Sequence, residues 1–143
     1  MDDPAQRKGD VLTTADYAAL AELRHALRRF SAFSEGAARM VGLPPQQHQA
    51  LLAIKGAPLA HPVTIGFLAE RLVIAPHTAT ELVSRLVDAA LVRRRPDPHD
   101  GRRQVLELTA QAEIVLADLS EAHLKEIRLL APQLIEVLQA LAR

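Results

Sequence analysis

The polar side chains best suited to recognition chemistry lie in residues 76–90. At about 100° per residue this stretch forms a helix with one apolar side, and the opposite side centres on His77, Glu81, Ser84 and Asp88. Imidazole, hydroxyl and guanidinium groups hydrogen-bond to base edges or phosphates, and small side chains near a helix N-terminus let the helix enter a major groove. We favour a surface for double-stranded DNA over a merely solvated helix face. Its candidate contacts are Pro76, His77, Thr78, Thr80, Ser84 and Arg85.

A second candidate group occupies the polar loop 96–103. The Asp-Gly pair in this loop predicts a tight turn, since glycine accepts a positive φ, and two arginines follow the pair directly. An arginine at the tip of a hairpin suits the narrow, electronegative minor groove of DNA. Two aspartates would repel phosphate, so we interpret them as carboxylates that orient the arginines. The candidate DNA contacts are His99, Arg102 and Arg103, and the orienting carboxylates are Asp97 and Asp100.

The flanking segments predict how these two groups are positioned. The β-prone runs 91–95 and 104–108 surround the loop and predict a β-hairpin. On the N-terminal side, the hydroxyl of Thr64 can cap a helix over 65–71, and a short turn at 72–75 leads to the DNA-facing helix. Two helices joined by a turn and followed by a two-stranded wing predict a winged helix-turn-helix, in which Thr64 is a further candidate DNA contact. Its rival is a small α+β domain that binds no nucleic acid.

Long amphipathic helices are predicted at both ends of the chain. Over 14–40, apolar residues recur at i, i+3, i+7 and i+10. Over 109–143, Thr109 is expected to cap a helix that reaches about Leu130, and Pro132 is expected to start a last helix. These helices carry more apolar surface than one short chain can bury, so we expect a homodimer, with intramolecular packing as the alternative. The candidate interface residues are Leu20, Leu134, Leu138 and Leu141.

The length and charge of the chain agree with this organisation. The 143 residues suffice for a single domain, with 1–12 as a flexible tail. A winged helix-turn-helix lobe over 43–108 (recognition helix 76–90, wing 91–108) would lie between dimerisation helices 14–40 and 109–143. The expected fold class is therefore mainly α (α+β). The formal net charge is zero, but six arginines lie in residues 85–103 against three aspartates, and this basic centre favours a polyanion partner.

Composition also excludes several classes of function. The chain has no cysteine, which excludes disulfides, zinc–thiolate sites and thiol redox sensors. The polar start resembles no signal peptide, and no apolar run approaches the ~18 residues of a membrane span, so we expect a cytoplasmic protein with no membrane partner. There is no glycine-rich phosphate loop and no histidine–carboxylate pair at metal-ligand spacing. We therefore expect no enzyme and no cofactor.

The hairpin carries a recognisable motif. The run Asp97-Pro98-His99-Asp100-Gly101-Arg102 matches the pattern D-x-R-D-G-R at most positions, and Leu106-Glu107-Leu108-Thr109 follows as a strand-to-helix junction. These segments resemble the wing of the MarR (multiple antibiotic resistance regulator) family. The resemblance covers about residues 14–142, and its helical segments begin at Gly42, Thr64 and Ala75.

This resemblance implies more than the residues show by themselves. It implies a homodimer joined by the first, fifth and sixth helices, with two wings on a pseudo-palindromic operator. It also implies a transcriptional repressor that a small-molecule effector releases by binding in a cleft between two lobes. In the family this cleft is lined by elements that correspond here to those carrying Arg24, His25 and His48. These side chains suit an anionic aromatic ligand.

Three residues depart from the family pattern. His99 stands where the wing has arginine, which weakens one cation at neutral pH. Ala90 replaces the usual glycine before the first wing strand, and Ala112 replaces a common glycine early in the long helix.

Two other functions stay open at this point. Six histidines permit a metal-responsive regulator, but they are scattered singly and predict no metal site. A winged-helix module that binds proteins and no DNA is the other alternative.

Overall fold

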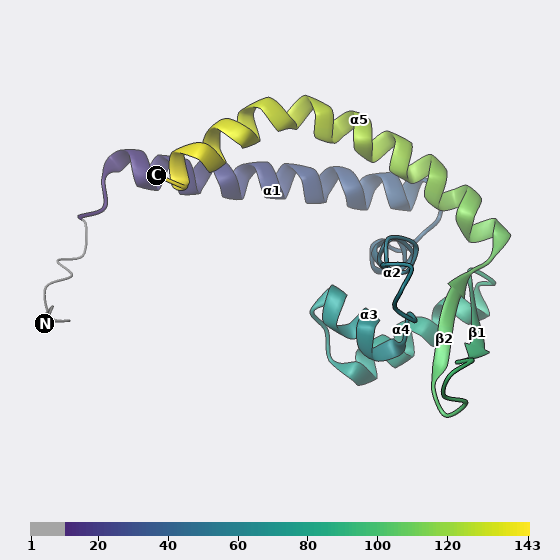
Figure 1. Ribbon diagram of the computed structural model, residues 1–143. Coiled ribbons are helices and arrows are strands. Elements are labelled where there is room, and N and C mark those ends of the chain that lie inside the picture. The colour runs from purple at the N-terminus through teal and green to yellow at the C-terminus, as the bar shows by residue number, and fades with distance from the viewer. Residues whose placement is uncertain (1–10) are drawn as a thin grey trace, which may run out of the picture. The chain divides into compact units, whose positions relative to one another are not determined.

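The computed structural model describes residues 11–143. The tail expected over 1–12 therefore lies outside the described residues, apart from Val11 and Leu12, which precede the first helix. In chain order the elements, labelled in Figure 1, are α1 (Thr14–Met40), α2 (Pro45–Lys55), α3 (Ile65–Leu72), α4 (Pro76–Asp88), β1 (Val92–Pro96), β2 (Gln104–Leu108) and α5 (Ala110–Leu141). No helix in the described part of the chain is long and apolar enough to cross a membrane.

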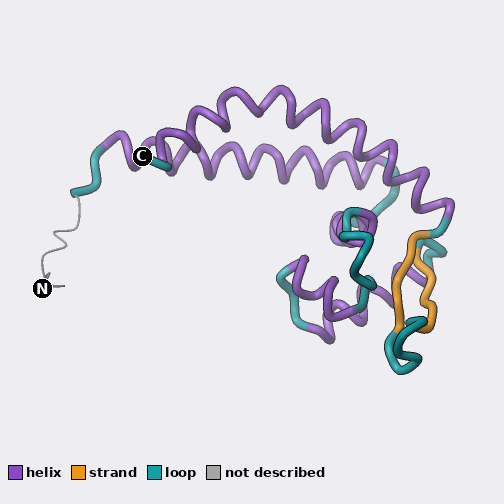
Figure 2. Tube along the Cα trace, viewed as in Figure 1, coloured by secondary structure: helices purple, strands orange, loops and turns teal. Residues whose placement is uncertain are grey.

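The chain divides into two compact units. The central unit, Ala32–Lys125, contains α2, α3, α4 and the hairpin, together with the adjoining ends of α1 and α5. The terminal unit contains the described residues 11–31 and Glu126–Arg143, which form the remainder of α1 and α5. Both strands belong to the central unit (Figure 2).

Local hydrogen bonds start three helices where the sequence predicts them. At α1, the backbone N–H groups of Thr13 and Asp16 each donate to the other residue's side chain, which forms a capping box. The Thr64 Oγ1 accepts from the N–H of Phe67 at 3.1 Å, and the Thr109 Oγ1 accepts from the N–H of Ala112 at 3.2 Å. The caps expected at Thr64 and Thr109 are confirmed.

The core of the central unit joins its helices to its hairpin. The largest fully buried side chains include Leu51 on α2, Leu68 on α3, Leu86 on α4 and Val92 on β1. The apolar side predicted for α4 is buried, whereas the polar side remains outside. Burial of one stripe thus fixes which face of α4 is available to a partner.

The hairpin is an antiparallel pair in which Val92 lies opposite Leu108 and Pro96 opposite Gln104. The first strand begins one residue later than the run 91–95 predicts. A backbone hydrogen bond from Leu106 N–H to the carbonyl of Val63, at 2.8 Å, fastens the hairpin to the segment that precedes α3.

The turn after β1 forms without the backbone conformation that its Asp-Gly pair predicts. The N–H of Arg103 donates to the carbonyl of Asp100 at 3.0 Å, so the turn is present. Among the described glycines, Gly42 has a positive φ, and Gly101 does not. The expectation of a positive φ at Gly101 is therefore wrong, because the loop closes through carboxylate–backbone hydrogen bonds that need no left-handed residue.

The helix expected over 76–90 ends at Asp88, and Ala90 lies beyond it with φ 59°. This is the left-handed region, which glycine adopts without the steric cost that a Cβ brings. This conformation explains why the family pattern has a glycine at the position that Ala90 occupies in this chain. The Thr109 hydroxyl donates to the carbonyl of Ala90 at 2.8 Å and holds it in place.

Pro132 does not start a separate helix, as the sequence led us to expect. It lies inside α5, which continues to Leu141 (Figure 1). A proline removes one helical hydrogen bond and usually kinks a helix. Leu130 before it and Leu134 after it line the same apolar groove between α1 and α5, so α5 keeps one face toward that groove across Pro132.

Candidate DNA-binding surface

The outer face of α4 presents most of the side chains predicted to contact DNA. Pro76, His77, Thr80 and Arg85 are exposed, and Thr78 and Ser84 are half-buried. The Thr80 hydroxyl donates to the carbonyl of Pro76 at 3.1 Å and keeps its lone pairs for a further donor. The N-cap residue of α4 is Ala75, whose side chain cannot accept a hydrogen bond, so free N–H groups at this end of the helix are available to a phosphate.

The loop after β1 is ordered by its two aspartates. Asp97 is buried and accepts from the N–H of His99 at 2.9 Å, and Asp100 accepts from the N–H of Arg102 at 3.1 Å. A second pair of backbone bonds, from Asp97 N–H to the Arg103 carbonyl and from Arg103 N–H to the Asp100 carbonyl, closes the loop. Both carboxylates thus fix the backbone that carries the exposed side chains of His99, Arg102 and Arg103. Their effect on the arginine side chains stays a prediction.

The N-terminal end of α3 and the arginines of the wing share one open depression. Its volume is about 370 Å³, and its lining includes Thr64, Gly66, Arg102 and Arg103. The first N–H groups of a helix lack intrahelical partners, and the guanidinium groups add positive charge. The structure therefore brings Thr64 together with two predicted wing contacts, in a place suited to the backbone of a polyanion.

The family is identified by comparison with known proteins. A model described as the MarR family matches residues 41–103, which include α2, α3, α4 and β1. The solved structure of a probable transcriptional regulator from Pseudomonas aeruginosa is 31% identical, with TM-score 0.61, over 84% of this chain and 90% of that one. This chain belongs to the MarR family of transcriptional regulators.

Other solved structures have the fold of this MarR-family regulator. AbsC, a MarR family transcriptional regulator from Streptomyces coelicolor, is 19% identical with TM-score 0.69, over 82% of this chain and 79% of that one. A mutant of S. aureus MepR bound to an oligodeoxyribonucleotide is 18% identical with TM-score 0.64, over 86% of this chain and 85% of that one. None of the curated proteins matches. The expected winged helix-turn-helix with long terminal helices is confirmed, and the family is one of DNA-binding regulators and not of enzymes.

One residue of the MarR-family surface was not among the predicted contacts. The Arg94 guanidinium donates to the Ser84 hydroxyl at 3.1 Å, so β1 adds a cation to the exposed face of α4. Its neighbours Arg93 and Arg95 instead lie 3.6 and 2.7 Å from the carboxylate of Glu107 on β2. Side chains alternate between the two faces of a strand, and this period could have separated Arg94 from its neighbours in the sequence.

The three candidate effector residues have different environments. Arg24 and His25 are exposed on the part of α1 that belongs to the terminal unit. His48 is only 3% exposed and lies in the central unit, on α2. Their role as effector contacts stays a prediction. Within residues 11–143, no group of three or more histidine, aspartate or glutamate side chains could hold a metal ion.

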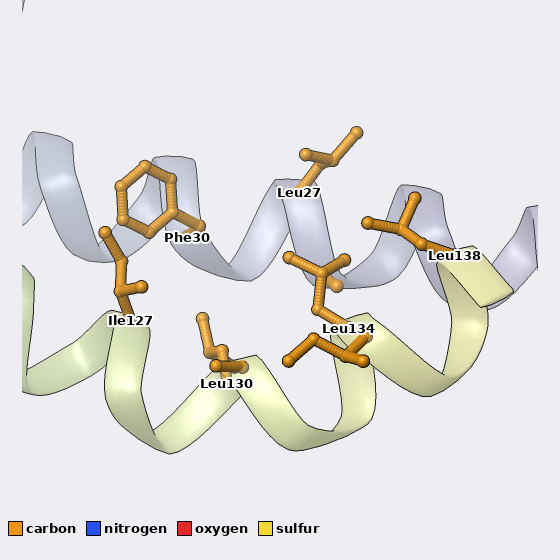
Figure 3. Close-up of a pocket in the computed structure, with 9 residues that line it drawn as sticks. Leu27, Phe30, Ile127, Leu130, Leu134 and Leu138 are labelled. Atoms are coloured by element: carbon orange, nitrogen blue, oxygen red, sulfur yellow. The ribbon is translucent and has the colours of Figure 1, made fainter.

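The four candidate interface leucines lie on the two helices of the terminal unit. Leu20 and Leu138 are each 47% exposed, and Leu134 and Leu141 are half-buried. Leu134 and Leu138 also line an apolar groove between α1 and α5, of about 280 Å³, which Figure 3 shows with Leu27, Phe30, Ile127 and Leu130.

Proposed function

We propose that this MarR-family regulator is a homodimeric repressor, which binds a pseudo-palindromic operator and leaves it when a small ligand binds. The observation that carries the DNA-binding mode is the exposed polar face of α4, to which Arg94 bonds and beside which the wing adds further arginines. In this mode α4 enters the major groove and the wing contacts the adjacent minor groove. The S. aureus MepR mutant that shares this fold is bound to an oligodeoxyribonucleotide, which supports DNA binding by this chain.

The test of this mode begins with DNA fragments that the protein selects from a genomic library. Because several phosphates are neutralised, log K should fall steeply and linearly with log salt concentration. Arg102→Ala should weaken binding to every operator, most where the flanks are A·T-rich. Thr78→Ala or His77→Ala should change which base pairs are preferred, at about 1–3 kcal/mol for each lost base contact.

Two outcomes would contradict the proposal. Equal losses on all sequences from the three substitutions would mean that α4 contacts only the DNA backbone. Absence of any binding at low salt would instead favour the module that binds proteins and no DNA.

The proposed homodimer is supported by the apolar surface of the terminal unit. Leu20 on α1 and Leu138 on α5 are about half exposed, as is Ile135 on α5. Two helices alone cannot enclose apolar side chains on all sides, and the same helices of a second copy would remove this surface from water. The oligomeric state should therefore depend on Leu138, as tested below.

Release by a small ligand is supported by the family resemblance and by the exposed guanidinium of Arg24 on α1, one of the expected cleft elements. The experiment titrates anionic aromatic compounds into the preformed operator complex and follows fluorescence anisotropy. An effector should lower the operator affinity by about 5–150-fold, the usual range of allosteric coupling. Arg24→Ala should reduce this coupling, and the same coupling in both proteins would remove Arg24 from the effector site.

A further inference from the structure

His48 and His123 form a buried pair within the central unit. Their ring centroids lie 4.8 Å apart with the planes tilted by 46°, and the two residues are 3% and 8% exposed. The rings of Phe33 and His123 are in edge-to-face contact, with their centroids 5.4 Å apart and an angle of 70° between their planes. Since Phe33 is on α1, His48 on α2 and His123 on α5, the pair joins three helices.

The hydrogen bonds of the pair suit neutral rings. His123 Nδ1 donates to the carbonyl of Leu119 at 2.6 Å, because a carbonyl can only accept, and its Nε2 lies 2.8 Å from the hydroxyl of Ser34. His48 Nδ1 is buried and has no hydrogen-bond partner among the described residues. A neutral His48 can leave this nitrogen without a proton, whereas a protonated ring would bury an N–H with no acceptor.

A proton on His48 would also be poorly compensated by charge. Burial lowers the pKa of His48, and the neighbouring His123 lowers it further. On these three helices within the central unit, the charged side chains other than the pair are Glu35, Arg39, Lys55, Glu113, Asp118, Glu121 and Lys125. Ion pairs join all of these to one another except Asp118, which is exposed.

The position of α2 links the pair to the DNA-binding surface. The helix packs against α3, α4 and β2, and its Leu51 and Ile54 belong to the core that these elements share. A shift of α2 away from α1 and α5 would therefore move the elements that carry the candidate DNA contacts.

We propose that the His48–His123 pair is a proton-sensitive switch: the neutral pair holds α2 against α1 and α5, and proton uptake separates these helices and lowers DNA affinity. The predicted loss of DNA affinity rests on the proposed operator binding, whereas the predicted separation of the helices does not. Because the folded state disfavours the proton on His48, the packing is fully stable above the ordinary pKa of 6.5 and loses stability as pH falls below it. One proton taken up on release weakens binding by at most about tenfold per pH unit.

The experiment removes every other histidine, so that a pH effect on DNA affinity cannot come from His77 or His99 on the candidate DNA-binding surface. The background protein carries His25→Gln, His61→Gln, His77→Gln and His99→Gln and has no polyhistidine tag. It is compared with the same protein carrying His48→Phe, which keeps an aromatic ring against His123 but cannot take up the proton. Operator affinity is measured at pH 7.5 and 5.8 at constant ionic strength.

The background protein should lose about three- to fivefold in affinity between these pH values, which is near the most that uptake of one proton below pH 6.5 allows. The His48→Phe protein should lose less than twofold. An equal loss in both proteins would overturn the proposal. If His48→Phe does not fold, His48→Gln replaces it, since this side chain also takes up no proton.

Amide hydrogen exchange separates a failed switch from a failed operator assignment. In the background protein without DNA, the protection factors of residues 45–55 should fall at pH 5.8, and His48→Phe should retain them. If the protein binds no DNA at pH 7.5, the proposed operator function fails and this measurement still decides the switch. Unchanged protection in the background protein would overturn the switch, whatever the DNA affinity does.

Discussion

The central and terminal units differ in how far their apolar side chains are buried. The central unit fully buries leucines from three of its helices and a valine from its hairpin. No described residue of the terminal unit is buried, although its two helices carry an apolar groove and several half-exposed leucines. A unit with an enclosed core can present a fixed polar surface, whereas two helices without one need a further apolar surface. The difference therefore suggests a division between DNA binding and association, which the substitutions below test.

The largest effect is expected at the groove of the terminal unit. Leu138→Asp would bury a carboxylate in the proposed interface, which costs several kcal/mol, so the dimer should dissociate. Ile114→Asp is the matched control, because Ile114 is 66% exposed on the central-unit part of the same helix. Sedimentation velocity should find monomers for the first variant and dimers for the second. A folded monomer for the wild-type protein would refute the association role of this unit.

The core of the central unit should give the next largest effect, on stability. Leu51→Ala removes a fully buried side chain and should lower the free energy of unfolding by about 2–5 kcal/mol. Leu52→Ala, next to it on α2 but 50% exposed, should cost less than about 1 kcal/mol. Denaturant unfolding measures both values, and similar costs would show that the two leucines do not differ in burial as described.

Within the central unit, Arg94 and Arg93 should contribute differently to DNA binding. Arg94→Ala removes the cation on the α4 side and should weaken operator binding by about tenfold, with a salt slope smaller by about one per protomer. Arg93→Ala removes a side chain that lies beside Glu107 and should cost less. Anisotropy titrations at several salt concentrations distinguish them. A larger loss from Arg93→Ala would place the DNA on the other face of the strand.

The smallest expected effect concerns the backbone between α4 and β1. Ala90→Gly should raise the free energy of unfolding by about 0.5–1 kcal/mol, since glycine adopts a φ of 59° without steric cost. Ala89→Gly is the control, because φ is −80° at Ala89 and glycine should there lower stability by about 0.5–1 kcal/mol. Thermal unfolding should shift in opposite directions, and a shift in the same direction would contradict strain at Ala90.

The sequence by itself determined the features that depend on near neighbours. The spacing of apolar residues predicted α1 and the buried side of α4, because one stripe of a helix is set by residues three and four apart. The caps at Thr64 and Thr109 were predictable because each hydroxyl bonds an N–H three residues away. The order of the helices and the hairpin followed from these local signals. That order was enough to predict most residues of the candidate DNA-binding surface.

The tertiary structure decided what depends on residues distant in the chain. Arg94 joins the surface of α4 only because β1 packs beside that helix, and His48 meets His123 across 75 positions of the sequence only because α2 and α5 are packed together. Pro132 lies inside α5 and starts no new helix, which the local rule for proline did not predict. Such contacts depend on how all the elements share one packing arrangement, so no pattern confined to one segment predicts them.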